Sequence, residues 1–223
     1  MTRKTFLNSA VVVAVLFAAA QGAWAQSLDD LLARMPAEDE AAFEATCGDL
    51  VELGPDAVAG LCAMVAPPEE TGDVNVRFLL SGLAKYVIQE DQENAREWVG
   101  ETLADALGEA GQDAVKAFLM RQLQVCGGDE AVTELAFYLY HDTLHEPAAA
   151  ALTAIGTEAA GEALLDALPK VDGARRIAII DALAAMAHAP AAGAVAKLAG
   201  SGDTGVRRAA VRALARLGGP EHA

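Results

Sequence analysis

The sequence has few aromatic residues, few cysteines and few basic residues for its length of 223. Aromatic residues make up 5% of it, there are three cysteines, and 16 lysines and arginines stand against 32 aspartates and glutamates. The formal net charge of −16 disfavours nucleic acid and anionic lipid as partners, because both are negatively charged. It is compatible with a basic partner or with an acidic surface that is simply solvated.

The motifs of common catalytic sites are also missing. The sequence contains no glycine-rich phosphate loop, no Cys-x-x-Cys pair and no Gly-x-Ser-x-Gly motif. Carboxylates are abundant, but they are scattered over predicted solvated helix faces, so no pair stands out as catalytic. We therefore predict a protein that is not an enzyme and that uses no cofactor.

One constellation has the spacing of a metal site, because His141-Asp142 is followed by His145-Glu146. In a helix, the two histidines would share a face at the four-residue separation used by zinc sites. However, Pro147 follows at once, and Asp142 is better placed as a helix cap in a loop between two helices. We predict no metal site here.

Residues 1–25 have the pattern of a signal peptide. Arg3 and Lys4 provide the positive start, residues 10–20 are apolar, and Ala23-Trp24-Ala25 has small residues at the positions that signal peptidase inspects. The apolar run is much shorter than the roughly 20 residues needed to span a bilayer. We predict cleavage after Ala25, a periplasmic or extracellular location, and no membrane insertion of residues 26–223.

Residues 26–223 predict one all-helical domain, since alanine and leucine dominate and alternating β-branched runs are missing. Within the segment 172–218, two consecutive units superimpose at an offset of 31 residues. The matched pairs include Asp172 and Asp203, Arg176 and Arg207, Ala182 and Ala213, and Leu183 and Leu214. A helical repeat of this period predicts a stack of helix pairs, because one pair cannot bury its apolar face without a neighbour.

We expect an α-solenoid of about five helix hairpins followed by a terminal helix. Residues 26–68 form an N-terminal hairpin region, a proline-rich and polar break follows, and residues 72–223 form the main repeat stack. The terminal helix, residues 203–218, is amphipathic, and Asp203 is placed to cap its N-terminus.

The run D-T-G-V-R-R-A-A-V-R-A-L-A-R-L-G, from Asp203 to Gly218, resembles the first helix of a HEAT repeat of the short bacterial type, including those called phycobilisome-lyase-like. The resemblance is good over residues 111–218 and fades toward the N-terminus. It implies a right-handed solenoid that binds another protein on the concave face lined by its second helices, and it implies no activity. In addition, residues 118–132 are similar to repeats that accompany secreted sugar-degrading domains of the 3-keto-disaccharide hydrolase kind, although no such domain is present.

The charge is distributed unevenly along the chain. Residues 26–110 carry 19 acidic and 4 basic side chains, whereas residues 111–223 carry 13 and 10. A basic strip lies on the predicted terminal helix and consists of Arg207, Arg208, Arg212 and Arg216. The strip is a candidate contact for a carboxylate-rich partner or for the acidic half of a second copy, and the alternative is a solvated helix face.

Three aromatic residues concentrate in the second predicted hairpin: Phe78, Tyr86 and Trp98. Beside acidic side chains, such a patch is able to bind a sugar ring or a basic peptide. The alternative is that the three rings fill a wide gap in the core.

Cys47 and Cys62 lie in the first predicted hairpin, each seven residues from the Gly54-Pro55 turn. In an antiparallel helix pair they would stand at the same height, which favours a disulfide in an oxidising compartment. The alternative is a pair of buried thiols that act as small apolar residues. Cys126 is then left as an unpaired structural thiol.

The sequence therefore predicts an exported, non-catalytic interaction scaffold that binds a partner protein. A second hypothesis is an accessory module of a secreted carbohydrate-degrading system, which would bind glycans. A more distant hypothesis is a hydrolase whose site lies on the aromatic hairpin.

Overall fold

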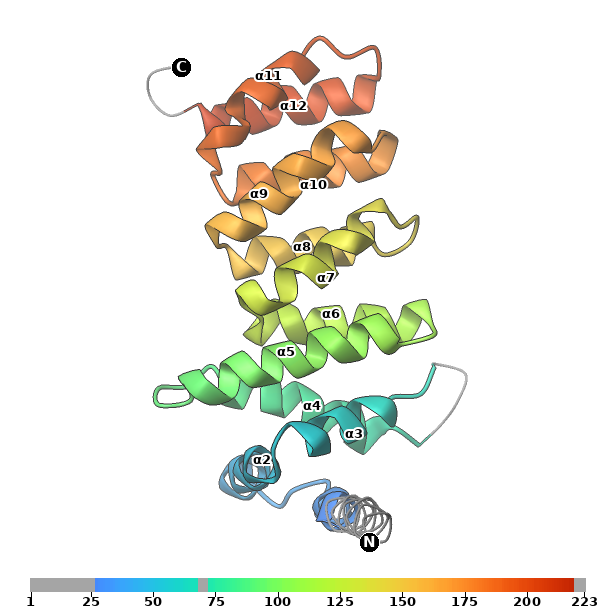
Figure 1. The fold of residues 1–223 in the computed structure, drawn as a ribbon, viewed down its shortest axis with the longest axis vertical. Coiled ribbons are helices and arrows are strands. Elements are labelled where there is room, and N and C mark those ends of the chain that lie inside the picture. The colour runs from blue at the N-terminus through green and yellow to red at the C-terminus, as the bar shows by residue number, and fades with distance from the viewer. Residues whose placement is uncertain (1–26, 68–71, 219–223) are drawn as a thin grey trace, which may run out of the picture.

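The computed structural model describes residues 27–67 and 72–218, and every regular element within these ranges is helical (Figure 1). The predicted signal peptide and most of the predicted break after Pro67 lie outside the described residues. The described part of α1 covers residues 27–33. The other α-helices are α2 (Glu40–Leu53), α3 (Pro55–Ala63), α4 (Val74–Tyr86), α5 (Glu93–Glu109), α6 (Asp113–Cys126), α7 (Val132–Phe137), α8 (His145–Ile155), α9 (Glu158–Ala167), α10 (Gly173–Ala185), α11 (Ala192–Leu198) and α12 (Thr204–Leu217).

The all-helical class is confirmed, while the helix count differs from the prediction of about five hairpins and a terminal helix. The numbering reaches α12 because α1 lies ahead of the first helix pair. Short 3-10 turns extend several of the second helices: η1 (Asp129–Ala131), η2 (Tyr138–Tyr140), η3 (Leu168–Lys170) and η4 (Ala189–Ala191). No helix among the described residues is both long enough and apolar enough to cross a membrane.

The helices stack along the longest axis of the molecule in chain order (Figure 1). Helices α2, α4, α6, α8, α10 and α12 contact one another in series, and we call them the even row. Helices α3, α5, α7 and α9 contact one another in a second series, which we call the odd row, and α11 packs on α12. The two rows contact each other mainly where an odd helix meets the even helix that follows it in the chain, as α5 does with α6, α7 with α8 and α11 with α12.

The 31-residue period is visible in the hydrogen bonds between neighbouring pairs. The Tyr138 hydroxyl donates to the carbonyl of Leu107 at 3.2 Å, and the Arg212 guanidinium donates to the Asp181 carboxylate at 2.8 Å. In both cases the two residues are 31 apart. The repeat detected in residues 172–218 thus has a counterpart in contacts that reach back to α5.

Side-chain caps begin three of the helices. Asp39 accepts from the Ala42 N–H at 2.8 Å at the start of α2, and Thr157 accepts from the Ala160 N–H at the start of α9. The predicted Asp203 cap is confirmed, because its carboxylate accepts from the N–H groups of Gly205 and Val206. These contacts satisfy backbone donors that the first turn of a helix leaves unpaired.

Candidate functional site

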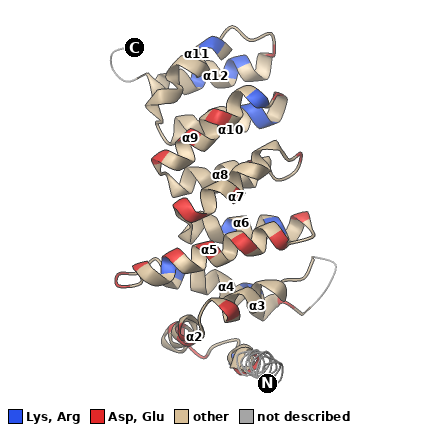
Figure 2. Cartoon of the chain, viewed as in Figure 1, with Lys and Arg blue, Asp and Glu red and all other residues tan. Residues whose placement is uncertain are grey.

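The two rows differ in charge, and this difference is the main surface feature of the molecule. The odd row, with η1 counted as the start of α7, carries twelve carboxylates and one basic side chain, a net charge of −11. The even row carries seven carboxylates and ten basic side chains, a net charge of +3. Figure 2 shows acidic segments along α5 and basic ones on α10 and α12.

Helix spacing places the odd-row carboxylates on the surface. On α5 they recur every four residues, which keeps successive side chains neighbours on a helix. We call the following nine residues the acidic face: Glu97, Glu101, Asp105 and Glu109 of α5, Glu130 and Glu134 of η1 and α7, and Glu158, Glu162 and Asp166 of α9. Seven of them are exposed, and Glu130 and Glu134 are half-buried.

A short sequence pattern occurs twice on this face. Helix α5 contains Gly100-Glu101-x-Leu103-x-Asp105, and α9 contains the same residue types from Gly161 to Asp166. The offset is 61 residues, close to two repeat periods. In both copies the leucine is buried, while the glutamate and the aspartate are exposed. A search for self-similarity at 61 residues would have found this pattern, which comparison at 31 residues misses because α7 lacks it.

Two cavities flank α5, and neither is lined by a basic residue. The cavity between α5 and α7 has a volume of about 670 Å³, and five residues of the acidic face line it: Glu101, Asp105, Glu109, Glu130 and Glu134. The cavity between α3 and α5 has a volume of about 640 Å³ and shares Asp105 and Glu109 with the first. Residues of the acidic face on α5 therefore line a cavity on each side of this helix.

The carboxylates of the acidic face form no ion pair with a basic side chain of residues 27–67 or 72–218. The ion pairs among the described residues involve Asp49, Asp73, Asp113, Asp142, Asp172 and Asp181, and none of these belongs to the acidic face. Like charges at this density repel one another, so a basic ligand would relieve the repulsion.

The predicted basic strip is not one uniform surface. Arg212 pairs with Asp181 of α10, and Arg207 donates to the carbonyl of Ser201 at 2.7 Å and to Thr204. Arg208 donates to the Thr204 carbonyl, and both Arg208 and Arg216 are exposed. Two of the four guanidiniums thus hold α12 to its surroundings, which leaves Arg208 and Arg216 as the more open cations of the strip.

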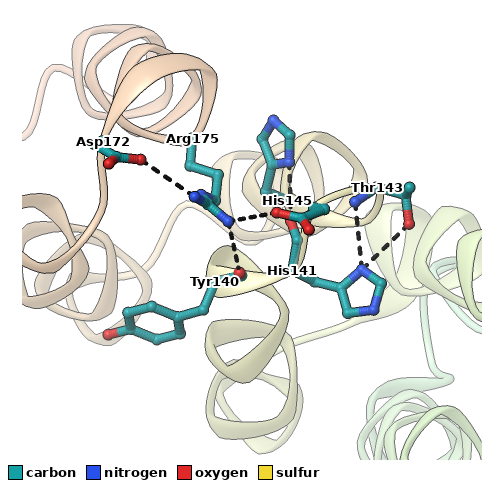
Figure 3. Close-up of polar contacts among 7 residues, drawn as sticks. Tyr140, His141, Thr143, His145, Asp172 and Arg175 are labelled. Atoms are coloured by element: carbon teal, nitrogen blue, oxygen red, sulfur yellow. Dashed lines mark hydrogen bonds and ion pairs between the residues drawn. The ribbon is translucent and has the colours of Figure 1, made fainter.

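His141 and His145 do not converge on a common point (Figure 3). The His145 ring is buried, and its Nδ1 donates to the carbonyl of His141 at 3.0 Å. The His141 ring instead accepts from the Thr143 N–H at 3.3 Å and faces Asp113 of α6. Among the described residues, no group of three or more histidine, cysteine and carboxylate side chains is arranged to hold a metal ion.

Arg175 of α10 connects the loop before α8, which contains His141 and Asp142, to the next helix pair (Figure 3). Its guanidinium donates to the carbonyl of Tyr140 at 3.3 Å, to Asp142 at 2.6 Å and to Asp172 at 3.2 Å. Asp142 was predicted to cap α8, and that prediction is wrong, because α8 begins at His145 and Asp142 pairs with Arg175. Arg175 lies 33 residues from Asp142 in the sequence, so the residues around Asp142 did not indicate this ion pair.

Replacing Arg175 with alanine should lower the free energy of unfolding by about 1–2 kcal/mol, because one half-buried guanidinium serves three acceptors, including a backbone carbonyl. Urea denaturation measures the change. Arg208→Ala is the control, since its guanidinium makes one long contact of 3.4 Å and is exposed, and it should cost less than about 0.5 kcal/mol. Equal losses in the two variants would contradict the bracing role.

The three aromatic residues of the second hairpin differ in their surroundings. Phe78 is 53% exposed, and its ring packs on Phe43 of α2 with 4.7 Å between the centroids. Tyr86 is half-buried with its hydroxyl close to Gly48 of α2, and Trp98 is half-buried against the core. The partner ring of Phe43 was not foreseen, because it lies in the preceding helix pair.

All three cysteines are free, buried thiols, so the predicted Cys47–Cys62 disulfide is not formed. The prediction assumed that both side chains face each other across the helix pair. In the structure the Cys62 thiol lies within electrostatic range of Cys126 on α6, whereas the charged neighbour of Cys47 is Glu44 on its own helix. Burial raises the pKa of Cys47 to about 11 and the pKa values of Cys62 and Cys126 to about 12.

No protein-family model and no curated protein matches this chain. Among solved structures, the crystal structure of an engineered protein aligns with 86% of this chain and 96% of its own chain, at 20% sequence identity and a TM-score of 0.44. A likeness at this level assigns neither a ligand nor an activity.

Proposed function

We propose that this chain is an exported, non-catalytic interaction scaffold, a right-handed α-solenoid of the HEAT-repeat kind, that binds a basic partner protein through its acidic face. The observation that carries the proposal is the charge of the odd row: twelve carboxylates against one basic side chain, with no ion pair on the acidic face. Helical-repeat stacks bind partners on an extended concave surface, and the HEAT resemblance implies that the second helices line it.

The distribution of the carboxylates favours a macromolecular partner over a bound cation. The acidic face extends over α5, α7 and α9, and successive carboxylates on α5 stand one helical turn apart, about 6 Å. A chelated ion needs several oxygens within about 2.6 Å of one point. Basic side chains spaced along a protein surface match a row of separated carboxylates better.

Self-association is a weaker candidate than a different partner. The chain has a net charge of −16, so two copies repel each other at a distance. Several cations of the even row are already paired within the molecule, including Arg77 with Asp73, Arg175 with Asp142 and Arg212 with Asp181. These three guanidiniums are therefore not open to the acidic face of a second copy.

The predicted signal peptide, residues 1–25, supports a periplasmic or extracellular location, and a partner would be found there. The glycan-binding accessory role remains a prediction from the sequence. No observation of the aromatic residues favours it, since Phe78 packs on Phe43 while Tyr86 and Trp98 are half-buried.

The test is affinity capture with residues 26–223 as bait and the exported proteins of the encoding organism as prey. The acidic-face variant is Glu101→Gln, Asp105→Asn and Glu109→Gln, and the matched control removes three exposed charges of α2 with Glu40→Gln, Glu44→Gln and Glu52→Gln. A basic protein that is captured by the wild type and the control, and lost with the acidic-face variant, is the expected result. Equal capture by all three baits, or a captured partner that is itself acidic, would overturn the proposal.

A further inference from the structure

Apolar side chains and carboxylates both line the cavity between α3 and α5, and we call the first group its floor and the second its rim. Its floor contains Val65, Val115 and Leu119, all buried, together with the small side chains of Ala59, Ala63 and Ala106. Three exposed carboxylates, Asp56, Asp105 and Glu109, stand among the lining residues, and no basic residue does. Its volume of about 640 Å³ falls in the range of ligand pockets in proteins.

The lining differs from that of two other cavities of the described residues. The cavity between α5 and α7 is lined by five carboxylates and few apolar side chains, so it suits cations alone. A groove over α8 and α10 has an alanine-rich lining and two carboxylates, of which Asp181 already pairs with Arg212 and Glu146 makes no ion pair among the described residues. Among these three, the cavity between α3 and α5 combines an apolar lining with three carboxylates without ion pairs, whereas the groove over α8 and α10 has one such carboxylate.

We infer that this cavity receives an apolar anchor side chain of the basic partner, flanked by lysine or arginine residues that lie against Asp56, Asp105 and Glu109. The inference rests on the proposed function and specifies the chemistry of the partner segment as amphipathic as well as basic. Lysine and arginine suit the rim, because their aliphatic stems cover apolar surface while their charged ends reach the carboxylates. An anchor in a desolvated pocket surrounded by polar contacts is the common arrangement of an interface hot spot.

The test uses two synthetic peptides of equal charge, rich in lysine and alanine, one with a central leucine and the other with serine at that position. Isothermal titration measures their affinity for residues 26–223. The leucine peptide should bind about tenfold or more tightly than the serine peptide, since burial of one leucine side chain contributes at least that factor.

Two tryptophan variants locate the anchor. Ala59→Trp places a large side chain from the exposed side of α3 into the cavity, and it should reduce the affinity for the leucine peptide to that for the serine peptide. Thr133→Trp lines the other cavity, between α5 and α7, and it should preserve the leucine preference. Circular dichroism confirms that both variants remain helical.

The outcomes separate this inference from the proposed function. If both peptides bind equally, or if Ala59→Trp preserves the preference, the anchor cavity is refuted while the acidic face stands. If both peptides bind the variant with Glu101→Gln, Asp105→Asn and Glu109→Gln as tightly as they bind the wild type, the proposed function itself fails.

Discussion

Raising the pH from about 9 to about 11 should destabilise this protein steeply, because two deeply buried thiols cannot ionise in the folded state. The pKa values of Cys62 and Cys126 are raised from 9.0 to about 12, mainly by burial. In the unfolded chain the same thiols lose their protons near pH 9, so above that pH the unfolded state binds fewer protons than the folded state. The free energy of unfolding should therefore fall by about 1.4 kcal/mol per pH unit for each thiol.

The stability contributed by the two protonated thiols is fully present below pH 9 and is lost as the pH rises toward 12. Urea denaturation at a series of pH values measures the slope. The control carries Cys62→Ala and Cys126→Ala, which removes both titrating groups and should leave a much shallower slope. A residual slope is expected from Cys47, whose pKa is raised to about 11, and from Tyr138, whose pKa is also raised by burial. Identical slopes in the wild type and the control would refute the assignment to the thiols.

Two equivalent glycines should respond to alanine in opposite directions. A Cβ on Gly161 would lie 2.3 Å from Nδ1 of His188, whose ring is buried against α9, so the imidazole has to move. We expect Gly161→Ala to lower the free energy of unfolding by about 1–3 kcal/mol, the usual cost of overpacking. Gly193 is 32 residues further on, and a Cβ there meets nothing within 4 Å.

Gly193→Ala should therefore stabilise the chain by about 0.5–1 kcal/mol, since alanine restricts the unfolded chain and favours the helix. Thermal unfolding of both variants and of the wild type measures the two changes in stability. A loss of stability in Gly193→Ala as large as that in Gly161→Ala would mean that the two positions are not distinguished by the His188 contact.

The helical class and the C-terminal repeats were predictable because their signals are local. The stripe on α12 and its Asp203 cap lie within one helix, and the 31-residue offset needs only two adjacent units. The break between α2 and α3 was also marked locally by Gly54, where the backbone φ of +85° suits glycine. Each of these features depends on residues that are close together in the sequence, so no knowledge of the three-dimensional contacts is needed to predict it.

The acidic face was not predictable in the same way. The sequence suggested a division of charge between the N-terminal and C-terminal halves, whereas the structure divides it mainly between odd and even rows. This division appears only when alternate helices are known to lie side by side. The predicted Cys47–Cys62 disulfide depended on side-chain direction, which sequence spacing does not give, and the structure holds both residues as free, buried thiols.

Carbodiimide crosslinking of the wild-type chain to an oligolysine peptide would test the central claim most directly. The reagent joins a carboxylate to an amine only where the two are in contact, and mass spectrometry identifies the carboxylate. The account predicts that crosslinks concentrate on the acidic face, at Glu97, Glu101, Asp105 and Glu109 of α5 and on α7 and α9. Crosslinks that fall equally on Glu40, Glu44 and Glu52 of α2, which are also exposed, would contradict it.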